Sequence, residues 1–115
     1  MESEKAVKIL RPFIPLPGNG WTYLWRLEVK PGSEVTEHYH HHWVASFHED
    51  PEPGDPKIEL VVDGRTIFPT SGEVIKIPPY TPHSVPVWKG KHSRRTYALA
   101  VDINDDRQCV KTVVR

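Results

Sequence analysis

Prolines and glycines are scattered along the whole chain and limit what it can fold into. Twelve prolines and seven glycines divide its 115 residues into short segments. Because proline lacks a backbone donor and breaks helices, few of these segments leave room for a three-turn helix. Many of them alternate polar residues with β-branched or aromatic ones, which is typical of half-buried strands. The chain is therefore predicted to be all-β.

The clearest predicted strand is 21–29, in which Tyr23, Trp25, Leu27 and Val29 share one face. Further strands are predicted at 34–41, 43–48, 57–63, 66–69, 73–77, 83–88 and 95–103. Between two of them, Asp63-Gly64 predicts a tight hairpin turn. The segment 104–115 fits either a final strand or a short helical turn. Many short strands separated by turns predict a sandwich or a barrel.

Length and charge exclude several classes of protein. A chain of 115 residues with 37% hydrophobic content can bury one core, so we expect a single domain over 1–115. Its core barrel is expected at about 20–105, with an N-terminal arm, 1–19, and a C-terminal segment, 104–115, packing on the barrel or on a dimer partner. The net charge of zero argues against nucleic acid and anionic membranes as partners.

The sequence also bears on location and on thiol chemistry. The first twenty residues lack the apolar core of a signal peptide, and no run of eighteen apolar residues occurs, so we expect a cytoplasmic protein. Cys109 is the only cysteine, which excludes an internal disulfide. We expect it to be a small buried apolar residue.

Five of the seven histidines lie within 38–48, in the segment TEHYHHHWVASFH. Alternate side chains of a strand point to one face, so His38, His40 and His42 would share a face from which His41 points away. Imidazoles two positions apart can converge on one ion, because their Cα atoms lie about 6.5 to 7 Å apart. Helical spacing would instead pair His38 with His42, but aromatic and β-branched residues disfavour a helix here. The pair His38 and His40 therefore predicts half of a metal site.

The other half is predicted at His83. The preceding segment, GEVIKIPPYTP, offers a glycine, a short alternating strand and prolines that force a turn. His83 opens the next predicted strand, so its imidazole would stand at the rim of the β-structure. A strand placed there could close the site that His38 and His40 begin.

These two segments resemble the two motifs of the cupin family. The first motif, glycine, five residues and His-x-His, matches Gly32, His38 and His40. The second, glycine, five residues, Pro-x-Gly, two residues and histidine, matches Gly72, Pro78 and His83. The resemblance covers 32–83 and implies a cupin-type double-stranded β-helix, an antiparallel jelly-roll barrel, with one divalent metal ion inside. It also implies a homodimer.

The chain departs from the cupin pattern at three places. The glutamate that normally follows His-x-His is replaced by Val44 or Ala45, the second-motif glycine is Tyr80, and HEDPEPGDPK lengthens the connection between the motifs. The expected ligand set is therefore His38, His40 and His83 without a carboxylate. His42 or His48 is the candidate fourth ligand.

The absent carboxylate leaves the full charge of a divalent ion uncancelled, which favours anionic, chelating substrates. By resemblance to three-histidine cupin dioxygenases, the leading function is a non-haem Fe(II) dioxygenase acting on a small dicarbonyl, phenolic compound or organic acid. The alternative is an isomerase, lyase or cyclase that uses Zn, Ni, Mn or Co as a Lewis acid, and Cu is a further candidate ion. A non-enzymatic barrel that binds a sugar or another small molecule is the third class, because fold alone does not choose among them.

Other candidate residues have no motif around them. An acid or base for the alternative function could come from Glu28, Glu49, Glu59, Tyr80 or Tyr97. The substrate pocket is expected to include Trp43, Phe47, Tyr80 and Arg26. Arg26 and Arg65 could hold a substrate carboxylate, although an exposed salt bridge is the simpler expectation for both.

Overall fold

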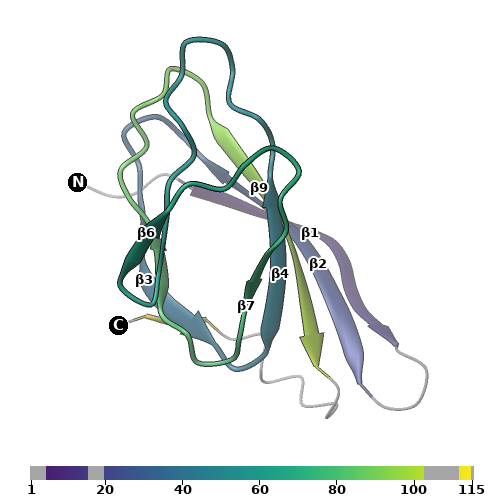
Figure 1. Ribbon diagram of the computed structural model, residues 1–115. Coiled ribbons are helices and arrows are strands. Elements are labelled where there is room, and N and C mark those ends of the chain that lie inside the picture. The colour runs from purple at the N-terminus through teal and green to yellow at the C-terminus, as the bar shows by residue number, and fades with distance from the viewer. Residues whose placement is uncertain (1–4, 16–19, 103–111, 115) are drawn as a thin grey trace.

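The computed structural model describes residues 5–15, 20–102 and 112–114. All regular structure in these ranges is β-strand, arranged as two five-stranded antiparallel sheets that face each other (Figure 1). This arrangement confirms the prediction of an all-β domain. No helix in the described ranges is long and apolar enough to cross a membrane.

Each sheet combines strands that are distant in the sequence. The first sheet has the order β1 (Lys5–Pro15), β2 (Trp21–Val29), β9 (Arg94–Asp102), β4 (Trp43–His48) and β7 (Ile75–Ile77). The second has the order β10 (Thr112–Val114), β3 (Val35–His40), β8 (His83–Val85), β5 (Leu60–Val62) and β6 (Arg65–Ile67). Neighbours in space are thus mostly not neighbours in sequence, as in a jelly roll.

The predicted strands are found, with changed ends. Strands β2 and β4 have the predicted bounds, whereas β8 ends at Val85 because Pro86 cannot donate to a ladder. Within the expected N-terminal arm, 1–19, residues Lys5–Pro15 form β1, which pairs with β2 along most of its length. The C-terminal segment contains the strand β10, paired with β3, while Cys109 lies outside the described residues.

The inner face of the first sheet combines large residues with small ones. Trp25 lies opposite Ala98, and Tyr23 lies opposite Ala100, across the β2–β9 ladder. Both alanines are buried and also pair with β4, opposite Ser46 and Val44 in the same order. Small side chains along the middle strand leave unfilled volume between the sheets. This volume becomes the cavity described below.

One end of the barrel is closed by a tightly packed apolar cluster. Its buried members are Val29, Val35, Ile58, Leu60, Val85 and Trp88. The Arg94 guanidinium lies 5.6 Å from the centroid of the Trp88 ring, on its face. Gly90 packs against the indole so closely that a Cβ at this position would lie 2.4 Å from a ring atom. Glycine is therefore required here by packing.

We expect Gly90→Ala to lower the free energy of unfolding by about 1–3 kcal/mol, because the added methyl group must displace the buried Trp88 ring. Denaturant unfolding followed by tryptophan fluorescence would measure the change. Lys89→Ala, at an exposed neighbouring position, is the matched control and should change stability little. Equal stability of wild type and Gly90→Ala would contradict the packing argument.

Positive φ angles explain the glycines of both motifs. Gly32 and Gly72 have φ of 83° and 76°, in the left-handed region that glycine enters without strain. Tyr80, which stands where the cupin pattern has glycine, also has a positive φ, 64°. The turn thus keeps its shape at a cost of about 1–2 kcal/mol. At Asp63 and Gly64 both φ angles are positive, which confirms the predicted hairpin turn.

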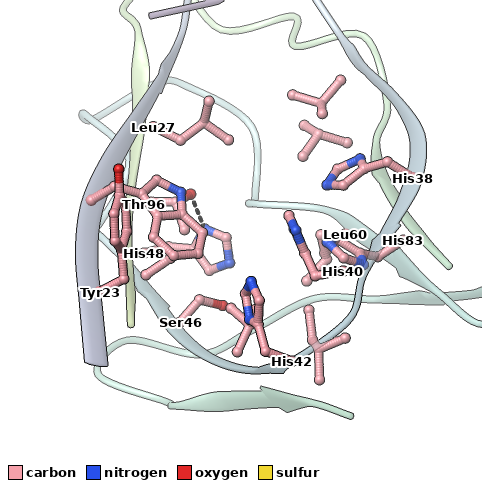
Figure 2. A pocket seen from close by; sticks show the side chains of 16 residues that line it. Tyr23, Leu27, His38, His40, His42, Ser46, His48, Leu60, His83 and Thr96 are labelled. Atoms are coloured by element: carbon pink, nitrogen blue, oxygen red, sulfur yellow. Dashed lines mark hydrogen bonds between the residues drawn. The ribbon is translucent and has the colours of Figure 1, made fainter. Parts of the chain in front are cut away.

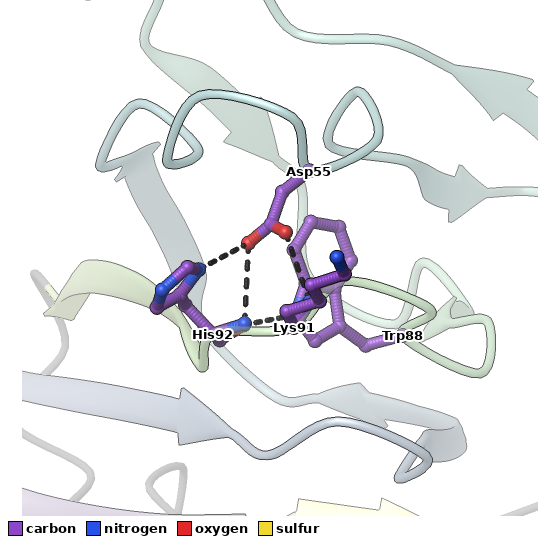
Figure 3. A network of polar contacts seen from close by, with 4 residues as sticks. All are labelled: Asp55, Trp88, Lys91 and His92. Carbon is purple, nitrogen blue, oxygen red and sulfur yellow. Dashed lines mark hydrogen bonds and ion pairs between the residues drawn. The ribbon is translucent and has the colours of Figure 1, made fainter.

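The long connection between β4 and β5 is fixed to the rest of the barrel by Asp55. Its carboxylate accepts hydrogen bonds from the Lys91 and His92 amides, at 2.9 and 3.2 Å, and from His92 Nδ1 at 3.1 Å (Figure 3). The side chain of Asp55 is only 2% exposed. These donors, the Lys91 amide first, lower the pKa of Asp55. The connection is therefore an ordered part of the fold.

Candidate metal centre

A cavity of about 250 Å³ lies between the two sheets (Figure 2). Aromatic and aliphatic side chains form most of its wall: Tyr23, Trp25, Leu27, Val35, Val44, Leu60, Ile77, Val85 and Ala98. Its polar groups are all uncharged or histidine: His38, His40, His42, Ser46, His48, His83 and Thr96. No carboxylate among the described residues lines it. The chemistry available in the cavity is therefore that of imidazole and hydroxyl groups.

Three histidines of the second sheet meet at one wall of the cavity. His38 and His40 come from β3, and His83 comes from β8, directly opposite His38 in the ladder. One ring nitrogen from each lies within 4.8 Å of the others. The ring centroids of His38 and His83 are 4.1 Å apart. The structure thus brings together the three residues that the sequence predicts as ligands.

A β-bulge in β3 sets the direction of these side chains. Val35 pairs with Val85 and His38 pairs with His83, so three steps on β3 match two steps on β8. Val35 and His38 therefore both face the cavity despite their odd separation. After the bulge the alternation is regular and turns His40 inward as well.

Hydrogen bonds to backbone carbonyls fix the tautomers of these rings. His38 Nδ1 lies 2.8 Å from the Thr36 carbonyl oxygen, and His83 Nδ1 lies 2.9 Å from that of Thr81. A carbonyl only accepts, so each Nδ1 carries the proton and donates it. The lone pair of each neutral ring is then on Nε2. Metal-binding histidines are held in this way in other proteins.

Burial keeps two of the rings neutral. It lowers the pKa of His83 to about 4, with a further contribution from the His38 ring that outweighs the opposing bond to Thr81. Burial, followed by the His83, His38, His42 and His41 rings, lowers the pKa of His40 to about 3. Both imidazoles are therefore deprotonated and able to bind a cation at neutral pH.

This donor set fits a divalent transition metal. Three imidazoles, each neutral once it coordinates, suit Zn, Cu, Fe or Ni, and Zn bonds to imidazole nitrogen at about 2.0–2.1 Å. The remaining coordination positions would face the cavity, where a small ligand can reach them.

The two candidate fourth ligands lie in different places. His42 is 3% exposed, its ring centroid is 5.2 Å from that of His40, and its Nδ1 lies 3.0 Å from the Trp43 carbonyl oxygen. It therefore has the same tautomer as His38 and His83 and borders the three-histidine group. His48 lies on β4, in the other sheet, and its Nδ1 contacts side chains instead of a carbonyl.

The four residues expected in the substrate pocket do not line the cavity. Trp43 and Phe47 are exposed, because odd-numbered positions of β4 face away from the second sheet. Tyr80 is 63% exposed and contacts the rings of Tyr39 and His41. Arg26 lies between Trp25 and Leu27, which line the cavity, so strand alternation turns its side chain to the other face. Strand parity thus places these side chains outside the cavity.

The candidate acids and bases also lie elsewhere. Tyr97 donates a 2.8 Å hydrogen bond to Glu49, and Arg95 forms a 2.8 Å ion pair with Glu28 and a 3.7 Å contact with Glu49. This is a polar network on the outer face of the first sheet. Neither Glu59 nor Arg65 lines the cavity.

Sequence reasoning missed Ser46 and Thr96 as cavity residues. Both stand at inward positions, Ser46 next to Val44 on β4 and Thr96 next to Ala98 on β9. A hydroxyl side chain at an inward-facing strand position is the feature of the sequence that could have indicated them. Their place in the wall depends on the β4–β9 register, in which Thr96 pairs with His48 and Ser46 with Ala98.

Comparison with known proteins gives structural matches only. No protein-family model and no curated protein sequence matches the chain. Among solved structures, the polyketide cyclase RemF from Streptomyces resistomycificus matches with a TM-score of 0.61 and 21% identity, over 84% of this chain and 61% of that one. Salicylate 1,2-dioxygenase from Pseudoaminobacter salicylatoxidans matches with a TM-score of 0.61 and 10% identity, over 84% of this chain and 24% of that one.

The chain has a cupin-like fold. A protein of unknown function from Streptococcus pyogenes, SPY1581, has a TM-score of 0.60 and 13% identity, over 86% of this chain and 75% of that one. Identities this low establish the architecture alone. The cupin-like barrel and the three-histidine group agree with the expectation that the two sequence motifs raised.

We expect the purified protein to carry about one equivalent of a divalent transition metal, held by the three-histidine group. His40→Ala or His83→Ala should remove most of it, because each change leaves two imidazoles. Elemental analysis of the purified variants would measure the loss. His41→Ala, on the outer face beside Tyr80, is the control that should retain the metal. Unchanged metal content in both cavity variants would exclude the site.

The metal-free protein should lose stability on acidification. His40, His83 and His48 have folded-state pKa values of about 3, 4 and 4, below the ordinary 6.5. Unfolding near pH 5 therefore takes up as many as three protons, and stability is greatest above pH 6.5 and falls as the pH drops toward 4. Denaturant midpoints measured in chelator across this range would test it. A midpoint that rises on acidification would contradict these pKa directions.

Proposed function

We propose that the protein is a metal-dependent enzyme, a non-haem Fe(II) dioxygenase that acts on a small chelating organic compound. The observation that carries the proposal is a wall of three histidines, His38, His40 and His83, opening onto an apolar cavity that no carboxylate of the described residues lines. Bound there, Fe(II) would supply the electrons that activate dioxygen. The protein would hold the ion, orient the substrate and exclude water.

The charge of the site selects the substrate. Three neutral rings leave a divalent ion with its full charge, and no described residue of the cavity wall offsets it with a carboxylate. An anionic compound with two oxygens, such as an enolate, a catecholate or a hydroxy acid, would cancel this charge when it binds. Neutral molecules without a chelating pair would bind more weakly.

The walls select the body of the substrate. They are mainly aromatic and aliphatic, so they favour a planar or hydrocarbon framework. A cavity of about 150 Å³ accommodates benzene in an engineered protein. The 250 Å³ available here therefore admits a substituted ring or a folded chain of similar size. The structural match with salicylate 1,2-dioxygenase, a mutant of which was solved in complex with gentisate, supports an aromatic substrate.

A second candidate function is a non-redox cyclase or related isomerase or lyase. The match with the polyketide cyclase RemF favours it, because identity is higher there and the match covers 61% of that chain instead of 24%. A Lewis-acidic ion at the three-histidine group would stabilise an enolate without consuming dioxygen. The cavity and its substrate preferences would be the same.

Dioxygen dependence separates the two functions. We expect the Fe(II)-loaded protein to consume dioxygen when it is mixed with a β-diketone or a catechol, as measured with an oxygen electrode. His83→Ala should abolish the uptake, and His41→Ala should not. Product formation under strict anaerobiosis, followed by mass spectrometry, would instead assign the cyclase class. Lack of turnover with the iron-loaded, zinc-loaded and nickel-loaded protein in either atmosphere would overturn an enzymatic function for these substrates.

A further inference from the structure

His48 faces the three-histidine group from the opposite sheet (Figure 2). It is the last residue of β4, and its inward direction follows from the alternation that also turns Val44 and Ser46 into the cavity. Its partner across the β4–β9 ladder is Thr96, which also lines the cavity. A ligand in the cavity would thus lie between His48 and the candidate metal ligands.

The hydrogen-bond contacts of His48 differ in polarity from those of His38, His42 and His83. Its Nδ1 lies 2.8 Å from Thr96 Oγ1 and 3.4 Å from an Arg94 guanidinium nitrogen. A guanidinium only donates, so Nδ1 is held as an acceptor. The Thr96 hydroxyl can donate to the same atom. The ring proton of neutral His48 is therefore on Nε2, the opposite tautomer to that of His38, His42 and His83.

This tautomer disfavours His48 as a metal ligand through Nε2, because that atom has no lone pair to offer while it carries the proton. Nε2 is inaccessible to solvent and has no hydrogen-bond partner among the described residues. A buried N–H group without an acceptor is costly and is unusual unless a ligand supplies the acceptor. The side chain is built as a donor directed into the cavity.

Arg94 and Thr96 hold the ring in this state. Arg94 is buried, donates a 2.8 Å hydrogen bond to the Glu59 carbonyl and lies on the Trp88 ring, so its position is fixed. Burial, together with this cation, lowers the pKa of His48 to about 4. Arg94 and Thr96 thus act as positioning residues.

We propose that His48 Nε2–H binds a substrate oxygen that lies beyond the pair of oxygens chelated at the three-histidine group. This inference rests on the proposed metal site and narrows its substrate class. The compound has an apolar framework, a chelating pair at one end and a further carbonyl, phenolic or carboxylate oxygen toward the other. A simple β-diketone meets the first two requirements, and a triketone or a more highly oxygenated aromatic compound meets all three.

A matched pair of probes tests the inference on the zinc-loaded protein, in which no redox turnover intervenes. The probes are a seven-carbon β-diketone and the seven-carbon triketone that carries one more carbonyl, and calorimetry gives the affinity of each. We expect the ratio of triketone affinity to diketone affinity to be about threefold to tenfold higher in wild type than in His48→Leu, because one buried hydrogen bond contributes about this much to binding. The triketone has two chelating pairs of oxygens and the diketone has one, which favours triketone binding statistically. This advantage is the same in wild type and in His48→Leu, so comparing the two proteins removes it.

Two controls keep the outcomes distinct. His48→Gln, whose amide N–H can replace Nε2–H, should restore much of the preference, and all variants should bind the diketone equally. An equal preference in wild type and His48→Leu would overturn the role of His48 while leaving the metal site intact. Failure of zinc-loaded wild type to bind the diketone would instead overturn the proposed metal site, and with it this inference.

The tautomer provides a test that needs no metal. Proton–nitrogen correlation spectra of the imidazole rings in the metal-free protein should show His48 protonated at Nε2, and His38 and His83 protonated at Nδ1. Thr96→Val should weaken the triketone preference and leave diketone affinity unchanged. A His48 ring protonated at Nδ1 in wild type would overturn the proposal directly.

Discussion

The register between β3 and β8 is the constraint on which the site depends. It places His38 opposite His83. One extra residue on β3 also lets Val35, at an odd position, and His38, at an even one, face the same wall of the cavity. A slip by one residue would turn Glu37 and Tyr39 into an apolar cavity and the histidines out of it. The amide of Tyr80, which donates a 2.7 Å hydrogen bond to the His40 carbonyl, fixes the turn that leads into β8. Tyr80 thus holds this register although its own φ is strained.

The sequence predicts the strands, the hairpin at Asp63-Gly64 and the three histidines because each depends on local spacing. It does not predict the bulge in β3, since only pairing with another strand defines a bulge. Trp43 and Phe47 are expected in the pocket because they lie beside the histidines in the sequence, but successive side chains of a strand alternate between its faces, and both lie outside the cavity. His48 could be placed inside by parity, but its tautomer depends on Arg94, which is 46 residues away in the sequence.

The absence of a motif glutamate changes the whole cavity and not only the metal ligand set. Of the two residues that replace it, Val44 lines the cavity and Ala45 does not. The inner face of β4 thus offers an aliphatic group, a hydroxyl and a neutral imidazole where the cupin pattern would provide an anion. No described residue brings negative charge to the cavity, so a divalent ion bound there would favour anionic ligands over neutral ones of similar shape.

The opposed tautomers of the two sheets give the cavity a direction. Ring nitrogens with lone pairs stand on one wall, an N–H group stands on the other, and hydrocarbon separates them. A molecule with a chelating end and a single acceptor end can occupy this space in one orientation, because the reversed molecule would present a lone acceptor to the metal and two oxygens to a single donor. With a metal ion bound as proposed, the barrel would therefore prescribe which carbon of an elongated substrate lies beside the ion, and so would determine regiochemistry through hydrogen-bond polarity instead of steric fit.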